Sequence, residues 1–322
     1  MGGDDNRHMN ANPPYQGCTA LADWGMIRAS GPDAASFLQG QLTSDTANLA
    51  LSQARLAGYC SAKGRLLASF IVWKLAHDEV LLACSADLLR ATLKRLQMFV
   101  LRAKCKLSDA SAEVPLHGLA GTAAIDWLGD AAPLAVWAKT ERDGACVVRL
   151  PDAAGTARFL SAGGDAAPAL PALPLDVWRW LEVRSGVARI EQATAERFVP
   201  QMLNYELLGG VDFAKGCYPG QEVVARSQYR GTLKRRSLLF ETDGQALAGQ
   251  DVFHFDDPGQ PAGQVVNAAP QPRALPQGSL ALVEIKLAAL GAGSLHLGAA
   301  GGPALRRIEM PYALPLDAVE AN

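Results

Sequence analysis

The segment between residues 54 and 101 most constrains how this chain can fold. Runs rich in Val, Ile, Leu and aromatic residues predict strands over 54–61, 65–75 and 79–84, because such side chains favour a pleated, half-buried surface. Residues 86–101 then change to a helical period, with Leu88, Leu89, Leu93, Leu96 and Val100 along one stripe. A shorter helix is predicted over 33–42. This order of elements predicts the α+β class, with helices on one face of an antiparallel sheet.

The remaining chain predicts two further domains. A second, smaller α+β segment covers roughly 112–165, and the Pro-rich and Ala-rich residues 163–176 connect it to a helix over 176–185 that is capped by Asp176. Beyond Gly231, short β-like runs predict a small barrel or sandwich. We therefore expect a disordered leader over 1–18, one α+β domain over 19–110 that packs with part of 170–230, a second over 111–230, and a β-barrel domain over 231–322.

Composition excludes several classes of partner. The 322 residues carry a formal net charge of −2, so there is no global attraction to nucleic acid or to an anionic membrane. The longest apolar run, over 66–73, is too short to span a bilayer, and the polar N-terminus lacks the apolar core of a signal peptide. We expect a cytoplasmic protein. The six cysteines form no C-x-x-C pair, so no metal site is predicted, and Cys84 and Cys146 are expected to be buried in strands.

The segment KGCYPGQE, residues 215–222, carries the strongest local chemistry. Pro219 and Gly220 predict a type II turn, followed by a helix that ends near Gly231. Cys217 then lies near the positive end of that helix and close to Lys215, and both favour the thiolate. The alternative is a structural turn in which Cys217 fills a small gap. Glycines on both sides of the thiol favour the close approach of a ligand or partner.

The same segment resembles a known family. Residues 198–236, with the core K-G-C-Y-x-G-Q-E, resemble the signature of the YgfZ family, and the resemblance extends to 31–45, to 59–70 and to PYAL at 311–314. It implies a GcvT-like ring of three domains, two ferredoxin-like α+β domains and a small C-terminal β-barrel, around a channel for tetrahydrofolate or a one-carbon derivative. It implies that Cys217 is an essential thiol assisted by Lys215. The other motif residues that it implies are Gly216, Tyr218, Gly220, Gln221, Glu222 and Arg226.

Two tryptophans match the family's folate-lining positions. They are Trp24 in LADWGMIRASG and Trp178 in DVWRWLEVRSG. An indole face gives a flat pterin stacking area and excludes water, which supports the assignment. The runs around Trp73, Trp127 and Trp137 predict core positions instead.

The sequence departs from the related aminomethyltransferases at two places. Arg184 occupies the position of a pterin-binding glutamate, so Glu182 or Glu191 would have to replace that acid. Ala68 and Ser69 occupy the positions of the catalytic acidic pair, and neither can transfer a proton usefully. Aminomethyltransferase activity, and a conventional enzyme activity in general, are therefore not expected.

The resemblance implies an accessory protein that binds folate and supports iron–sulfur cluster assembly or repair. Its partners would be cluster-assembly proteins or cluster-dependent tRNA-modifying enzymes, and Cys217 would hold a transient cluster or contact a partner. No direct binding to nucleic acid or membrane is expected. One alternative is a folate-dependent one-carbon transferase that uses Asp45 or Glu182 as its acid. Another is a direct tRNA-binding protein that uses the basic residues 230–236.

Overall fold

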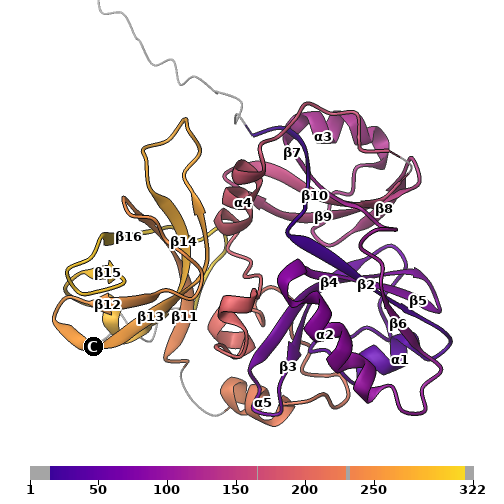
Figure 1. Ribbon diagram of the computed structural model, residues 1–322, viewed down its shortest axis with the longest axis horizontal. Coiled ribbons are helices and arrows are strands. Elements are labelled where there is room, and N and C mark those ends of the chain that lie inside the picture. Colours follow the sequence, from indigo (N-terminus) through magenta and orange to yellow (C-terminus); the bar gives the residue numbers. More distant parts are fainter. Residues whose placement is uncertain (1–14, 165, 230–232, 316–322) are drawn as a thin grey trace, which may run out of the picture.

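Two five-stranded antiparallel sheets and a closed barrel carry the chain in the computed structural model, which describes residues 15–164, 166–229 and 233–315. Figure 1 shows the three units arranged around a common centre. This is the three-domain α+β arrangement with a C-terminal barrel that the sequence predicts. None of the helices in the described ranges is long and apolar enough to cross a membrane.

The first sheet has the strand order β3-β4-β5-β2-β6, and helices α1 and α2 pack on it. The three strands and the long helix predicted from residues 54–101 are confirmed, the helix ending two residues early. Leu88, Leu89 and Leu96 are buried on its inner stripe. The elements are β2 (Trp24–Ser30), α1 (Ala34–Gln39), β3 (Ala54–Cys60), β4 (Leu66–Ala76), β5 (Glu79–Ser85), α2 (Ala86–Phe99) and β6 (Lys106–Asp109).

The second sheet has the order β1-β7-β10-β9-β8 and is covered by α3. Its first strand corrects the predicted leader over 1–18, because Gly17–Ala20 pairs antiparallel with β7 and Tyr15 is buried 5.1 Å from the Trp180 ring. Residues 1–14 of that leader lie outside the described residues. The elements are β1 (Gly17–Ala20), β7 (Leu116–Ala120), α3 (Gly121–Leu128), η1 (Gly129–Ala131), β8 (Lys139–Arg142), β9 (Ala145–Ala153) and β10 (Thr156–Gly163).

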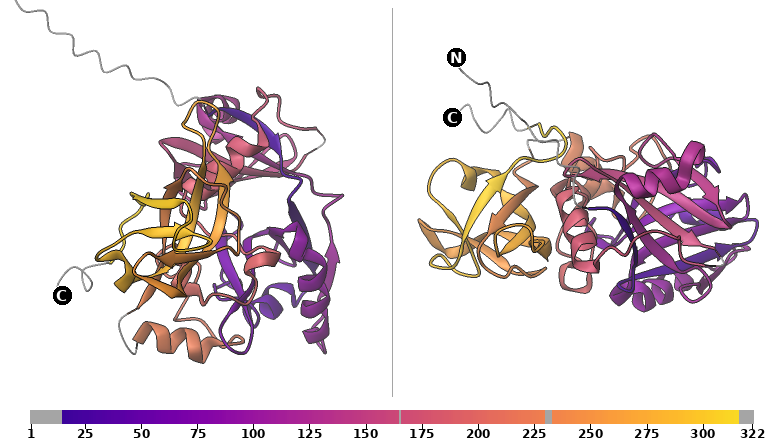
Figure 2. Two further views of the ribbon diagram at one scale, coloured as in Figure 1. Left: turned by 60° about the vertical axis from the view of Figure 1, so that its left-hand side comes forward. Right: turned by 90° about the horizontal axis from the view of Figure 1, so that it is seen from above.

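Helix α4 (Leu175–Arg184) connects the sheets to the barrel. It packs on β13 and β14 of the barrel and on β1 and β9 of the second sheet, and Figure 2 shows barrel and sheets on opposite sides of it. The predicted cap is wrong, since Pro174 and not Asp176 is the N-cap residue. Gly186 ends the helix at φ +68°, and its carbonyl accepts a hydrogen bond from the Tyr312 hydroxyl at 2.8 Å. The PYAL segment is thereby fastened to the end of α4.

The chain then passes through η2 (Gln192–Thr194), η3 (Pro200–Leu203) and α5 (Gln221–Tyr229) into the barrel. The barrel has the order β11-β14-β13-β12-β15-β16. Strand β15 is only three residues long, and a register shift interrupts β13. The elements are β11 (Arg235–Thr242), β12 (Asp251–His254), β13 (Asp257–Pro270), β14 (Ser279–Lys286), η4 (Leu287–Leu290), β15 (Leu295–Leu297) and β16 (Ala304–Ile308).

Candidate functional site

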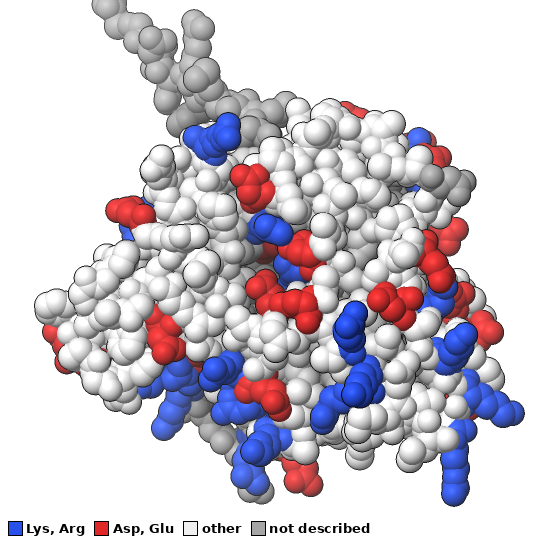
Figure 3. Space-filling model, viewed as in Figure 1, with Lys and Arg blue, Asp and Glu red and all other residues white. Residues whose placement is uncertain are grey.

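A cavity of about 500 Å³ lies where the two sheets, α4 and the barrel meet. Trp24 and Ser69 line it from the first sheet, Arg158 from the second, Glu182 from α4 and Asn267 from the barrel. Figure 3 shows acidic and basic side chains close together near the centre of the face. Because every unit contributes a wall, the cavity exists only in the assembled fold.

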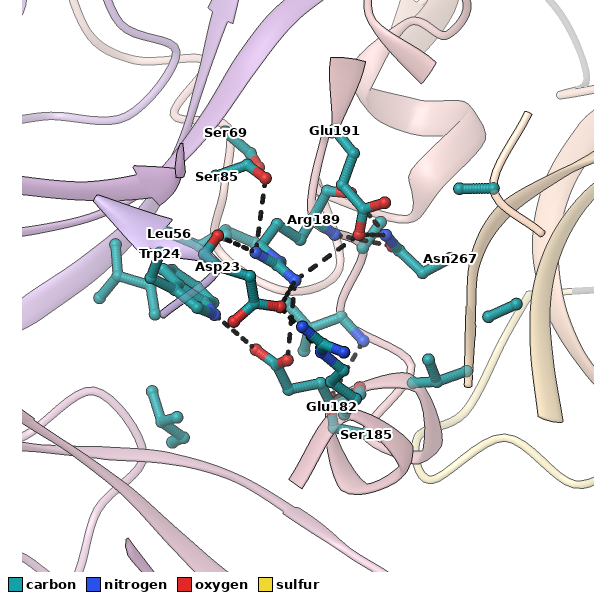
Figure 4. A pocket seen from close by; sticks show the side chains of 18 of the residues that line it. Asp23, Trp24, Leu56, Ser69, Ser85, Glu182, Ser185, Arg189, Glu191 and Asn267 are labelled. Atoms are coloured by element: carbon teal, nitrogen blue, oxygen red, sulfur yellow. Dashed lines mark hydrogen bonds and ion pairs between the residues drawn. The ribbon is translucent and has the colours of Figure 1, made fainter. Parts of the chain in front are cut away.

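One arginine organises the charged side of the cavity. The Arg189 Nη2 atom lies 3.0 Å from Asp23 Oδ2, 3.6 Å from Glu191 Oε1 and 3.9 Å from Glu182 Oε2. Arg179 adds a second contact to Asp23, with its Nε atom 3.0 Å from Oδ2. Figure 4 shows the Arg189 guanidinium surrounded by these three carboxylates. Acidic groups therefore outnumber the cations that pair with them here.

Trp24 is held in place from two directions. Its indole nitrogen donates a hydrogen bond to Glu182 Oε1 at 3.1 Å, and the Arg189 guanidinium lies 4.8 Å from its ring centre. A cation over an indole face is attracted by the ring quadrupole. The half-buried ring lines the cavity, where the resemblance places it.

Asn267 on β13 ties the barrel to the same group. Its Nδ2 atom donates to Glu191 Oε1 at 3.0 Å and to the Arg189 carbonyl at 2.8 Å, and its Oδ1 atom accepts from the Arg189 amide at 2.9 Å. The position of the barrel thus fixes the position of Glu191. No sequence pattern marked Asp23, Arg189 or Asn267, because they act together only after three segments meet.

Burial and neighbouring charge shift the pKa values of the three carboxyl groups in different directions. Burial raises the pKa of Glu182 and of Glu191, in each case against the charge of Arg189. Burial acts the same way on Asp23, but the charges of Arg189 and Arg179 outweigh it and lower the pKa of that carboxyl. The cavity therefore holds one firmly ionised carboxylate beside two that accept a proton more readily.

Trp178, the second tryptophan predicted to line a folate site, is not among the residues that line this cavity. It is fully buried, and a Cβ atom added at Gly118 would lie 2.5 Å from its ring. The guanidinium of Arg158, which lies on β10, is 4.7 Å from the centre of the Trp178 ring. Trp178 therefore supports a residue of the cavity wall and is not itself part of that wall.

Trp137 lines the cavity instead, although the sequence predicted a core position. It adopts φ +68°, a left-handed conformation that is costly for a bulky side chain. Two hydrogen bonds hold it there, from its amide to the Arg149 carbonyl at 2.8 Å and from the Ala54 amide to its own carbonyl at 2.7 Å. Trp73 is fully buried as predicted, whereas Trp127 is half-buried beside Arg142.

The positions that depart from the aminomethyltransferases are now placed. Glu182 and Glu191 both line the cavity, while Arg184 points elsewhere and donates to the Glu309 carbonyl at 3.1 Å. Ser69 lines the cavity, and its hydroxyl accepts from the Ile190 amide at 2.9 Å, whereas Ala68 is buried. Asp45 is not a lining residue and pairs with Asn48.

The KGCYPGQE segment lies apart from the cavity, and none of its residues lines it. Its predicted type II turn is confirmed, with Gly220 at φ +81° and the Gln221 amide 3.2 Å from the Tyr218 carbonyl. A Cβ atom at Gly220 would lie 2.4 Å from the Ser61 carbonyl, so this glycine is required by packing on the β3–β4 connection. An added Cβ at Gly216 would meet nothing within 4 Å.

Cys217 is exposed, whereas Cys60, Cys84 and Cys146 are buried, the last two as predicted. Its neighbour Lys215 donates hydrogen bonds to the carbonyls of Gln39 and Leu42, and burial lowers its pKa to about 8. The lysine also lies 5.0 Å over the buried ring of Tyr218. These contacts anchor the loop against the end of α1.

Helix α5 carries the remaining motif residues. Glu222 and Arg226 are exposed on it and Gln221 is half-buried, and Figure 1 shows α5 beside β3 at the edge away from α4. The predicted helix end at Gly231 lies outside the described residues. Across the described ranges no three His, Cys, Asp or Glu side chains lie together as a metal-binding group.

The basic segment 230–236 is largely used inside the fold, as far as it is described. Arg235 pairs with Glu284, and Arg236 Nη1 lies 2.8 Å from Glu206 Oε1 with both side chains almost fully buried.

A groove of about 580 Å³ lies next to the cavity and shares two wall residues with it, Leu56 and Trp137. The groove reaches Phe213 and Ala214, just before Lys215. The loop of Cys217 is thus connected to the cavity wall.

Comparisons with known proteins agree with this architecture. Residues 17–140 match the family model of the GCVT N-terminal domain. The tRNA-modifying protein YgfZ of Edwardsiella ictaluri is 34% identical over 274 residues, which cover 72% of this chain and 76% of that protein. The protein of the same name from Klebsiella pneumoniae is 31% identical over 247 residues, covering 72% and 74%.

A solved structure shows the same fold. The glycine cleavage system aminomethyltransferase T of Bartonella henselae aligns with a TM-score of 0.69 at 18% identity, over 94% of this chain and 86% of that one. The resemblance predicted from the KGCYPGQE segment is confirmed by the curated relatives. The chain belongs to the YgfZ family and has the fold of the glycine-cleavage aminomethyltransferases.

Proposed function

We propose that the central cavity binds tetrahydrofolate or a one-carbon derivative, and that the chain is an accessory protein that supports iron–sulfur cluster proteins and, through them, tRNA modification. The observation that carries the proposal is the cavity of about 500 Å³ in which Trp24, Glu182 and Glu191 converge. Its volume is within the range of about 300–1,000 Å³ that is usual for small-molecule sites.

The lining residues fit a reduced folate. A pterin ring is flat and carries several N–H donors along one edge. Glu182 and Glu191 offer carboxylate acceptors, while Leu56, Phe70 and Ile71 supply apolar surface. Glu182 takes the place of the pterin-binding acid whose family position is Arg184 here. Converging polar groups beside an apolar wall suit a specific small-molecule site.

Cys217 supplies the second part of the proposed function. It is exposed on a loop that Lys215 anchors, which suits contact with a partner protein. The described residues do not offer the several ligands that an iron–sulfur cluster needs, so this chain would contribute one sulfur and the partner the rest. The tRNA modification for which the relatives are named would then depend on enzymes that receive intact clusters.

The folate part is tested by calorimetric titration with tetrahydrofolate under reducing conditions. Glu182→Gln should weaken binding by about 10-fold or more, because it removes a charged acceptor from a buried site. Glu222→Gln, on exposed α5, is the matched control and should bind like the original chain. Equal affinities for all three proteins would contradict the assignment of the cavity.

The thiol part is tested in a strain that lacks the gene. Cys217→Ser should fail to restore cluster-enzyme activity and tRNA thiolation, while Cys105→Ser, which changes a half-buried cysteine elsewhere, should restore both. Full restoration by Cys217→Ser would show that the thiol is not the working group.

A second candidate function rests on Glu182. Burial raises the pKa of this carboxyl inside the cavity, which is the property of a general acid. A one-carbon transferase that uses Glu182 would convert methylene- or formimino-tetrahydrofolate in the presence of an acceptor. Absence of turnover with every amine tested would exclude it. The other acid considered, Asp45, is not at the cavity.

A further inference from the structure

Arg158 is a buried cation in the wall of the central cavity. It lies on β10, its exposed fraction is 3%, and it lines the cavity beside Leu150 and Pro151. Burial lowers its pKa to about 10, so the guanidinium stays charged at neutral pH. The fold therefore keeps a positive charge at the inner surface of the cavity.

This cation is poorly satisfied by the protein. Within the described ranges, its side chain makes one hydrogen bond, from Nη1 to the Pro151 carbonyl at 3.4 Å, and its buried Nε atom has no partner. Glu182 attracts it, but among the residues that the structure describes Arg158 forms no ion pair with any carboxylate. Arg189, by comparison, has three carboxylates within 3.9 Å of its guanidinium. The Trp178 ring, 4.7 Å away, compensates part of the charge.

Buried charges without partners destabilise a fold, so one that persists at a cavity wall points to a ligand. Arginine presents its donors in a fork that matches the two oxygens of a carboxylate. The cavity then offers opposite chemistry to two parts of one molecule. Glu182 and Glu191 accept N–H donors, and Arg158 receives an anion.

We propose that Arg158 binds a carboxylate of the glutamate tail of the cavity ligand and so discriminates folates from pterins that lack an anionic tail. This inference rests on the proposed folate-binding function. It gives the second sheet a role in ligand choice, while the acids of α4 and its following segment bind the ring. Trp178 acts through Arg158, because its ring holds the guanidinium at the cavity wall.

The test compares two ligands and three proteins by calorimetry. Tetrahydrofolate carries the anionic tail, and its dimethyl ester keeps the size of the tail without its charge. Arg158→Met should lose about 10-fold to 100-fold in affinity for tetrahydrofolate, as expected for one charge-assisted pair, and bind the ester as the original chain does. Arg149→Met is the matched control, because Arg149 pairs with Asp152 at 2.6 Å and does not line the cavity.

Arg158→Lys guards against a folding defect, since it keeps the charge and loses the fork. Arg158→Lys should still bind the acid more tightly than the ester, but by a smaller factor than the original chain does. If the original chain and Arg158→Met discriminate acid from ester equally, the inference is overturned while folate binding stands. If the original chain binds neither ligand, the proposed folate function itself is wrong and the inference falls with it.

Discussion

Arg189 Nη2 lies 3.0 Å from Asp23 Oδ2, and its Nη1 atom donates to the Asp23 carbonyl at the same distance. Asp23 directly precedes β2 of the first sheet, and Arg189 follows α4 by a few residues. The pair therefore joins two segments that are 166 residues apart in the sequence. The contact lies at the start of β2, in the wall of the cavity. The same contact that closes the ring of domains also places Trp24 and the carboxylates of the site.

Removal of the central arginine should destabilise the fold strongly. Arg189→Met would leave Glu182, Glu191 and Asp23 close together and without their shared cation. Breaking one side of a mostly buried charge network costs about 3–5 kcal/mol. Urea denaturation measures the free energy of unfolding. Arg184→Met, which removes one bond to the Glu309 carbonyl, should cost less than about 1 kcal/mol, and equal losses would contradict the central role of Arg189.

The carboxyl groups predict pH effects of opposite sign. The pKa of Glu182 is raised above 4.5, so its folded form holds a proton that the unfolded chain releases, and this contribution to stability is lost as the pH rises through the raised value. Glu182→Gln should therefore gain stability relative to the original chain between pH 5 and pH 7. Denaturation at both values measures the difference.

Asp23 provides the matched opposite case. Its pKa is lowered below 3.8, so its contribution is present above that value and is lost as the pH falls through the lowered one. Asp23→Asn should therefore be less stable than the original chain near neutral pH, and this difference in the free energy of unfolding should shrink as the pH falls. If both variants changed in the same direction with pH, the assigned shifts would be wrong.

The sequence predicts the elements better than the site. Periodic apolar patterns are local, so β3, β4, β5 and α2 follow from residues 54–101, and the turn at Gly220 follows from its local sequence. The short β15 has only three residues and no pattern to detect. β1 pairs with β7, almost 100 residues later, and such long-range pairing leaves no mark in the strand itself.

The site depends on the same kind of distant contact. Trp24 was predicted through its resemblance to the family and does line the cavity, whereas Trp178, predicted in the same way, supports Arg158 from behind. A helical position specifies which face a side chain occupies, but not which neighbour covers that face. Arg158 and Asn267 have no motif at all, because their role depends on burial and on unsatisfied or bridging hydrogen bonds.

Trp137 should show its strain and its function separately. At φ +68°, glycine is the residue best suited to the backbone, so Trp137→Gly should be more stable than Trp137→Ala by about 1 kcal/mol. Both variants remove an aromatic wall, and both should bind tetrahydrofolate about 10-fold less tightly. Denaturation and calorimetry on the two variants measure these effects. Unchanged affinity in both would exclude Trp137 from the site.

The two glycines beside Cys217 should respond differently to a methyl group. Gly220→Ala forces a side chain into the left-handed region and to 2.4 Å from the Ser61 carbonyl, so it should cost about 2–4 kcal/mol of unfolding free energy. Gly216→Ala meets nothing within 4 Å and should stay within about 0.5 kcal/mol. Because Gly216→Ala should leave the stability unchanged, its activity in the deletion strain reports on contact with a partner alone. Loss of tRNA thiolation with normal stability would indicate that a partner approaches the backbone at Gly216, whereas full activity would limit the need for glycine to the turn at Gly220.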